Sequence, residues 1–288
     1  MRLVVCHDAG GAEIVSSWLR RHGDADYACV LEGPARHVFE RKLGAVPETS
    51  LAQGIVDADS LLCGTSWQST LEFEAIGAAR RRGLPSAAFL DHWINYTERF
   101  QHEGETRLPD ELWVGDDFAR DRAEAEFPGS PVRLVGNPFL EDIREEVAKL
   151  PLRAGTGALS LLYVSEPVSE FGHMPGDPSG VGYDEHQALA FCLQRLDRLD
   201  PRIARVVVRP HPSEPAGKYD WAIGFRGLPV SLGGRAPLLE EIAGSDIVAG
   251  VESMAMVIGL LAGKRVLSCI PPGGRPCVLP FPEIERLG

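Results

Sequence analysis

The sequence predicts an α/β protein made of two doubly wound parallel sheets. Three observations predict it. Short apolar runs alternate with helical stretches along the 288 residues, the pattern stops at a turn-rich segment after residue 150, and it then starts again. Alternating strands and helices with buried strands are typical of a parallel sheet covered on both faces. We therefore expect one domain at residues 1–150 and a second at residues 158–288.

The first half contains six apolar runs of strand length. They occupy residues 3–6, 27–31, 60–63, 86–90, 111–114 and 132–135. Helical patterns follow or separate these runs at residues 12–21, 68–82, 118–126 and 139–150. Strands that alternate with helices in this way favour βαβ units and a parallel sheet.

The second half repeats this alternation after a turn-forming linker at residues 151–157. Its expected strands are residues 159–164, 205–209, 246–249 and 266–269, and its expected helices are 184–196, 237–243 and 253–262. A loop rich in Gly, Pro and Ser lies between Glu166 and Tyr183. A loop of this length in a compact domain is more often functional than merely connective.

Composition excludes several classes of protein. The net charge of −12 and the pI of about 5.2 argue against a general nucleic-acid binder, although a local cradle of backbone N–H groups can still hold a small anion. The apolar stretch at residues 247–263 carries Glu252 and is too short for a membrane span. The six cysteines form no CxxC pair, and the first residues do not resemble a signal peptide, so we expect a cytoplasmic protein.

Ligands of open parallel sheets bind outside the carboxyl ends of the strands, so the residues after each strand are the candidates. After the first strand, His7 and Asp8 are possible general bases, and Gly10 and Gly11 permit close approach of a ligand to a helix start. The alternative for Asp8 is a helix cap.

Polar and aromatic residues also follow the third and fourth strands of this half. Thr65 and Ser66 are helix caps or cleft-lining hydroxyls. A dense cluster after the fourth strand combines aromatic faces with hydrogen-bonding groups, which suits a sugar. The alternative is a set of rings that plug the top of the domain. This cluster comprises Asp91, His92, Trp93, Asn95 and Tyr96.

In the second half, Arg209 ends a Val-rich strand and His211 stands between two prolines, which fix the backbone on both sides of it. A rigidly held imidazole at a strand end can donate to a phosphate oxygen or act as an acid toward a leaving group.

The next strand leads into Glu252, Ser253 and Met254, which open an apolar helix. The free N–H groups and the dipole of a helix start favour a phosphate, while Glu252 suits ribose or base hydroxyls. Ser165 and Glu166 follow the strand at 159–164 and are expected to face the same cleft. No HExxH or CxxC spacing is present, so we expect neither a metal nor a cofactor.

Three passages resemble proteins of the GT-B fold. Residues 209–214 resemble the His-Pro motif of bacterial sialyltransferases, and residues 245–269 resemble the helix that holds the donor phosphate and the strand after it. Residues 134–138 resemble the passage that closes the first domain of UDP-N-acetylglucosamine 2-epimerases. Capsule polymer transferases and the UDP-sugar hydrolase of pseudaminic acid synthesis belong to the same group.

This resemblance implies two Rossmann-like domains that face each other across a cleft, with the donor on the second domain and the acceptor on the first. His211 then corresponds to the histidine associated with the donor phosphate. We expect a metal-independent glycosyltransferase of glycan or glycoconjugate biosynthesis that uses a CMP- or UDP-linked sugar. Its catalytic candidates are Asp8, His7, Asp91 and His211.

Two alternatives remain open. Small size favours a nucleotide-sugar hydrolase or 2-epimerase of the same fold. The absence of a clean paired-acid-glycine motif favours a non-catalytic nucleotide-sugar binding protein, because Asp8-Ala9-Gly10 and Gly115-Asp116-Asp117 both match that motif imperfectly. The sequence indicates no oligomeric state.

Overall fold

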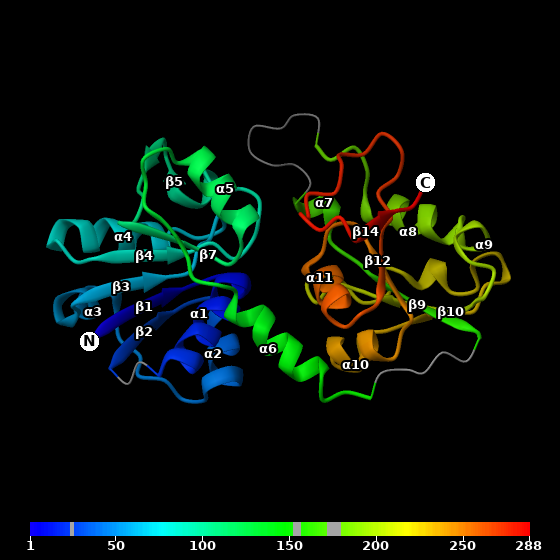
Figure 1. Ribbon diagram of the computed structural model, residues 1–288, viewed down its shortest axis with the longest axis horizontal. Coiled ribbons are helices and arrows are strands. Elements are labelled where there is room, and N and C mark those ends of the chain that lie inside the picture. Colours follow the sequence, from blue (N-terminus) through cyan, green and yellow to red (C-terminus); the bar gives the residue numbers. More distant parts are fainter. Residues whose placement is uncertain (24–25, 152–156, 172–179) are drawn as a thin grey trace. The chain divides into compact units, whose positions relative to one another are not determined.

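The computed structural model describes residues 1–23, 26–151, 157–171 and 180–288. The chain forms two compact units, Met1–Asp142 and Ile143–Gly288, and the boundary falls within helix α6 (Pro138–Val147) (Figure 1). The linker expected at residues 151–157 and the loop expected at 166–183 both include residues outside this description.

Unit 1 contains a parallel sheet of six strands in the order β2-β1-β3-β4-β7-β8. The strands are β1 (Arg2–Cys6), β2 (Tyr27–Leu31), β3 (Ser60–Cys63), β4 (Ser86–Phe89), β7 (Glu111–Val114) and β8 (Val132–Leu134). The chain leaves β1 toward β2 on one side and later continues from β3 toward β8 on the other. This sheet therefore changes direction between β1 and β3.

Helices cover both faces of this sheet. They are α1 (Ala9–His22), α2 (Ala35–Leu43), α3 (Leu51–Asp57), α4 (Leu71–Arg82) and α5 (Asp117–Glu126), with a short helix η1 (Glu98–Phe100) and a hairpin of β5 (Gln101–His102) and β6 (Glu105–Thr106). Helix α1 packs on α2, and α3 packs on α4 (Figure 1). The β1–β2 and β3–β4 crossovers run in opposite directions. Right-handed crossovers therefore place α1 and α4 on opposite faces.

The core of unit 1 explains why its central strand forms. Leu3, Val4, Val5 and Cys6 of β1 are completely buried, because β1 has a neighbouring strand on each side and helices on each face. Gly23 is the C-cap that follows helix α1, and its φ of +62° is the left-handed conformation that favours glycine.

Unit 2 contains a second parallel six-stranded sheet, in the order β11-β10-β9-β12-β13-β14. Its strands are β9 (Leu159–Val164), β10 (Ile203–Arg209), β11 (Val230–Leu232), β12 (Ile247–Gly250), β13 (Arg265–Ser268) and β14 (Ile284–Arg286). Here the chain changes direction between β9 and β12.

The helices of unit 2 are α7 (Val168–Phe171), α8 (Glu185–Leu193), α9 (Leu196–Leu199), α10 (Leu238–Ala243) and α11 (Met254–Leu261), with short helices η2 (Asp220–Ala222) and η3 (Phe225–Gly227). The apolar side of α8, including Leu189 and Cys192, packs with Val206 and Val208 of β10 into a core separate from that of unit 1.

The fold class predicted from the sequence is confirmed, and each expected strand is present within a residue or two of its predicted bounds. The edge strands β11 and β14 were not predicted. Both are three residues long, and β14 reads Ile-Glu-Arg, with two exposed residues. Such segments lack the continuous apolar run that marks a buried strand.

Neither a membrane-spanning helix nor a metal-binding cluster is present among the described residues. Within residues 1–23, 26–151, 157–171 and 180–288, no helix combines the length and apolar character needed to cross a bilayer. The same ranges contain no group of three or more His, Cys, Asp or Glu side chains that could hold a metal ion.

Candidate functional site

The carboxyl ends of β10, β9 and β12 lie side by side in unit 2, because these strands are neighbours in the sheet. His211 follows β10, Ser165 and Glu166 follow β9, and Glu252 follows β12. The change of direction between β9 and β12 is the position where open α/β sheets bind ligands. His211 and the start of α11 therefore occupy the same edge of one sheet, on either side of β9.

His211 is held by its own chain. Its Nδ1 lies 2.8 Å from Ser213 Oγ and accepts the Ser213 backbone N–H at 3.3 Å, while its backbone N–H donates to Glu214 Oε2 at 2.8 Å. With Nδ1 as an acceptor, we assign the proton of the neutral ring to Nε2. Partial burial lowers the pKa of His211, although Glu214 opposes this effect. At neutral pH the ring thus offers an Nε2–H donor.

A buried charge cluster lies beneath His211. Glu214 accepts the Tyr219 hydroxyl at 2.6 Å and Lys218 Nζ at 3.0 Å through Oε1, and its side chain is fully buried. Lys218 also contacts Glu185, and the Tyr219 hydroxyl contacts Ser165 Oγ at the end of β9. This cluster links the ends of β9 and β10 to the start of α8, so it fixes the backbone that carries His211.

Two carboxyl groups meet at the start of α11. Glu166 Oε2 accepts the Glu252 backbone N–H at 2.9 Å, and Glu252 Oε1 accepts Arg275 at 2.8 Å. Burial, together with the nearby carboxylates of Glu252 and Glu214, raises the pKa of Glu166 to about 8. Glu166 therefore retains its proton at neutral pH more often than an ordinary glutamate does, and can serve as a proton donor.

Helix α11 begins as the sequence predicts. Ser253 is its N-cap and accepts the Ala255 N–H at 3.2 Å, and Met254 is its first residue. The positive end of this helix dipole lies at the carboxyl edge of β12. Arg209, in contrast, pairs with Glu241 at 2.7 Å and donates to the Ala236 carbonyl, so its charge is engaged with α10.

In unit 1, the corresponding edge lies between β1 and β3, where two glycines bring the backbone segments together. A Cβ on Gly11 would lie 3.1 Å from the Gly64 Cα, and a Cβ on Gly10 would lie 1.9 Å from Asp91 Oδ2. Side chains at either position would push α1 away from β3 or displace Asp91. The glycines thus allow close packing of protein segments, and their expected role in the approach of a ligand stays a prediction.

Asp91 is part of a polar triad. Its Oδ1 lies 2.5 Å from the Arg99 guanidinium, and the Thr65 hydroxyl accepts from Arg99 at 2.7 Å and donates to Asp91 at 3.3 Å. Arg99 is 8% exposed, and its Nε is a buried donor with no partner among the described residues. This triad places a carboxylate against the start of α1.

His7 and Asp8 form a dyad at the end of β1. His7 Nδ1 lies 2.7 Å from Asp8 Oδ1, and the His7 backbone N–H donates to Glu72 Oε1 at 2.7 Å. Asp8 stands at the N-cap of α1 but makes no side-chain cap bond, so its carboxylate orients His7 instead. The His7 ring can then accept a proton at Nε2.

Glu72 is a buried acid that the sequence reasoning missed. It is 2% exposed, and burial raises its pKa to about 7. A signal was present, since Glu72 lies on α4 one turn before the apolar Ala75 and Ile76. Lys218, at i+4 from Glu214, was also missed.

The aromatic cluster after β4 is mostly internal. Trp93 and Tyr96 are 2% and 1% exposed, and Trp93 Nε1 donates to Asp116 Oδ2 at 2.9 Å. Burial lowers the pKa of His92 to about 4, so His92 is neutral. Asn95 adopts a φ of +60° in this turn. The burial of Trp93 and Tyr96 agrees with the alternative to a sugar-binding cluster, in which these rings fill the top of unit 1.

Ser66 likewise serves the local fold. Its Oγ accepts the backbone N–H groups of Gln68 and Ser69 at 3.1 and 3.0 Å, in the turn that precedes α4. The hydroxyl of Thr65, which belongs to the Asp91–Arg99 triad, is therefore the better candidate of the two for a role near the start of α1.

Comparison with known proteins identifies the fold. No family model and no curated protein matches the sequence. The solved UDP-GlcNAc 2-epimerase of Methanocaldococcus jannaschii matches with a TM-score of 0.60 at 9% identity, over 93% of this chain and 83% of that one. A putative UDP-N-acetylglucosamine 2-epimerase from Listeria monocytogenes gives 0.62 at 11%, over 93% and 78%.

A third solved structure, the glycotransferase of kitacinnamycin, matches with a TM-score of 0.57 at 15% identity, over 99% of this chain and 85% of that chain. At these identities the likeness concerns the fold. The two parallel six-stranded sheets with interleaved helices agree with it. The chain therefore has a two-domain, Rossmann-like α/β fold of the GT-B type.

Proposed function

We propose that the protein is a metal-independent glycosyltransferase that takes its sugar from a CMP- or UDP-linked donor. The observation that carries this proposal is the edge of unit 2, where the Nε2–H of His211 and the positive end of α11 flank β9. These groups suit the negative charge that develops on a leaving nucleotide phosphate. We further propose that unit 2 binds the donor and unit 1 binds the acceptor.

The chemical step requires a base for the acceptor hydroxyl. Among Asp8, His7 and Asp91, the geometry favours His7, because Asp8 orients its ring and leaves Nε2 to accept the proton. Asp91 Oδ1 is occupied by Arg99 and Thr65. The acceptor oxygen then forms a bond to the anomeric carbon. The bond from that carbon to the phosphate oxygen breaks, and its electron pair stays on the nucleotide.

We assign the remaining donor-binding roles from the positions of residues that follow β12. Glu252 would accept hydrogen bonds from ribose hydroxyls, and the backbone at Ser253 and Met254 would face the phosphate. The donor is a nucleotide sugar, and the acceptor is a glycan or small molecule bound on unit 1. We propose a cytoplasmic location, no bound cofactor and no nucleic-acid partner.

The proposal is tested by measuring the melting temperature of the protein with each of a set of nucleotides and nucleotide sugars. A ligand at a hundred times its dissociation constant stabilises the folded state by about 2.7 kcal/mol. We expect CMP, CDP, UMP or UDP, or a sugar ester of one of them, to raise the melting temperature. Failure of the whole panel to do so would contradict a nucleotide-sugar enzyme.

One observation favours a second candidate, a nucleotide-sugar hydrolase or 2-epimerase. Glu166 and Glu72 are two carboxyl groups with raised pKa values, one at the ligand-binding edge of each sheet, and proton transfer to or from a sugar needs such groups. Turnover of a donor without any acceptor would favour this candidate. Binding without turnover, with or without acceptors, would indicate a non-catalytic binding protein.

A further inference from the structure

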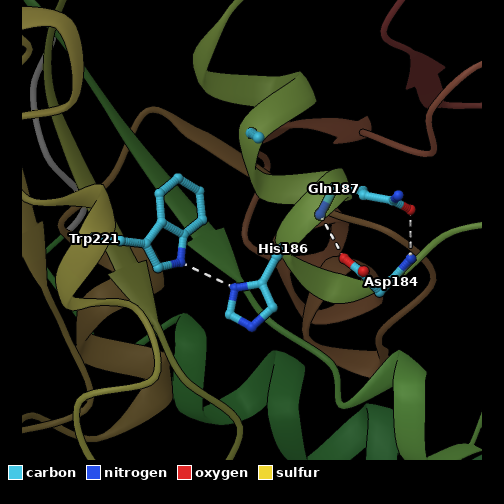
Figure 2. Close-up of a pocket in the computed structure, with 5 residues that line it drawn as sticks. Asp184, His186, Gln187 and Trp221 are labelled. Atoms are coloured by element: carbon cyan, nitrogen blue, oxygen red, sulfur yellow. Dashed lines mark hydrogen bonds between the residues drawn. The ribbon is translucent and has the colours of Figure 1, made fainter.

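Two adjoining hollows line the outer side of α8 in unit 2. The first has a volume of about 430 Å³ and is lined by Asp184, His186, Gln187, Ala190 and Trp221 (Figure 2). The second, of about 370 Å³, is lined by Gly182, Tyr183, Gln187, Ala190, Phe191, Gln194, Pro271 and Pro272. Because Gln187 and Ala190 belong to both, the hollows form one continuous surface, which we call the α8 groove.

Trp221 provides a fixed aromatic face at one end of the α8 groove. Its side chain is 39% exposed, yet its Nε1–H donates to His186 Nδ1 at 3.0 Å (Figure 2). Phe225 packs against the indole edge-on, with ring centroids 6.0 Å apart. An exposed ring that is already held in place loses little conformational entropy when a ligand stacks on it.

Polar groups on α8 supply directional contacts. Asp184 Oδ1 accepts the Gln187 N–H at 2.7 Å, and Gln187 Oε1 accepts the Asp184 N–H at 3.0 Å. This capping box orients the Gln187 amide (Figure 2). Its Nε2 group and Asp184 Oδ2 make no hydrogen bond with any described residue. The exposed Gln194 adds a second amide about 10 Å along the helix.

The charge of the α8 groove selects the class of ligand. Asp184 contributes a carboxylate to the first hollow, and no Lys or Arg lines it. At the second hollow, the Arg195 guanidinium lies 3.8 Å from the ring centroid of the lining residue Phe191 and is stacked on that ring. An anionic ligand on Trp221 would therefore meet the carboxylate of Asp184 at the first hollow, where no Lys or Arg side chain lines the surface. Aromatic faces, amides and one carboxylate together match a neutral ligand that carries both C–H faces and hydroxyl groups.

We propose that the α8 groove binds a neutral oligosaccharide chain, with a sugar ring stacked on Trp221 and hydroxyls bonded to Gln187 and Asp184. The second hollow reaches Pro271, which follows β13, so the groove opens at the sheet edge that carries Glu252. The chain would thus be anchored on unit 2 beside the candidate donor site. Only this anchoring role rests on the proposed function, because binding itself needs no nucleotide.

Titration calorimetry on the full chain, without nucleotide, tests the proposal. The probes are hexamers of glucose and of N-acetylglucosamine, with a hexamer of a uronic acid as the charged comparison. We expect at least one neutral hexamer to bind and the uronic acid hexamer not to bind. Trp221→Ala should weaken binding by roughly tenfold or more, and Gln187→Ala by several-fold.

Phe118→Ala is the matched control, because Phe118 is an aromatic residue of unit 1 that is 48% exposed. It should leave saccharide binding unchanged. Circular dichroism checks that each variant is folded, and Trp221→Phe, which keeps a ring, should retain part of the affinity.

Two results would overturn the proposal. They are the absence of binding of either neutral hexamer by the folded wild-type chain, and equal affinity in wild type and Trp221→Ala. Nucleotide binding by thermal shift is an independent readout. If the wild-type chain binds nucleotide but neither neutral hexamer, this inference is refuted and the proposed function still stands.

Discussion

Replacing Lys218 with Met tests the buried charge cluster beneath His211. Lys218 Nζ lies 3.0 Å from Glu214 Oε1 and also contacts Glu185, and these two carboxyl side chains are 0% and 4% exposed. Met retains much of the length of the lysine side chain but removes its charge. The substitution therefore leaves two carboxylates buried near each other without their common cation.

The pKa of Glu185 indicates how much stability Lys218→Met should lose. Burial opposes ionisation, but the ammonium of Lys218 and hydrogen bonds from Ser169 outweigh it and lower the pKa from 4.5 to about 2. One pKa unit corresponds to about 1.4 kcal/mol, and breaking a buried ion pair costs about 3–5 kcal/mol. We expect Lys218→Met to reduce the free energy of unfolding by about 3 kcal/mol at neutral pH.

Urea unfolding followed by tryptophan fluorescence measures this loss at neutral and acidic pH. Because the folded pKa of Glu185 is depressed, its stabilisation is present above 4.5 and disappears as the pH falls toward 2. The deficit of Lys218→Met should therefore shrink in acid. Lys149→Met, at an exposed position, is the control. A deficit below about 0.5 kcal/mol, within the range of ordinary surface substitutions, would show that Lys218 does not stabilise the buried carboxylates, and so would a deficit independent of pH.

Three further predictions concern the site. Because the folded-state pKa of Glu166 is raised to about 8, the contribution of this group to stability falls as the pH rises from 4.5 to about 8. Calorimetry at the upper end of this pH range should therefore give Glu166→Gln a higher melting temperature than wild type. Arg99→Met should destabilise more than the double variant with Asp91→Asn, because the single change leaves a partly buried carboxylate unpaired. A double-mutant cycle in urea measures this coupling. Gly10→Ala should lower stability in thermal unfolding, although Gly→Ala in a helix normally raises it by about 1 kcal/mol, because its Cβ would displace Asp91.

The order of the elements was predictable because each central strand is a continuous apolar run. The apolar runs at residues 159–164 and 205–209 correspond to β9 and β10, so the sequence also predicted that His211 follows β10. Sheet order was not predictable in detail. The edge strand β14 carries Glu285 and Arg286, and a half-solvated edge does not require apolar residues.

Side-chain partnerships were less accessible from the sequence. Asp8 has the residue type and place of a helix cap, yet its carboxylate bonds to His7. Glu72 and Lys218 have the sequence pattern of ordinary helix and loop charges, because their contacts with His7 and Glu185 join segments that are distant in the sequence. Long-range packing, rather than local pattern, decides which polar groups lose water and acquire shifted pKa values.

The role of His211 in phosphate binding is tested by the affinity of the nucleotide identified by thermal shift, measured for wild type and His211→Ala. The exposed His37→Ala is the control. We expect that loss of the Nε2–H donor weakens binding by roughly tenfold or more, as for a hydrogen bond to a charged phosphate, while His37→Ala binds normally. Equal affinity in the folded His211→Ala variant would contradict the assignment of this edge of unit 2 as the phosphate site.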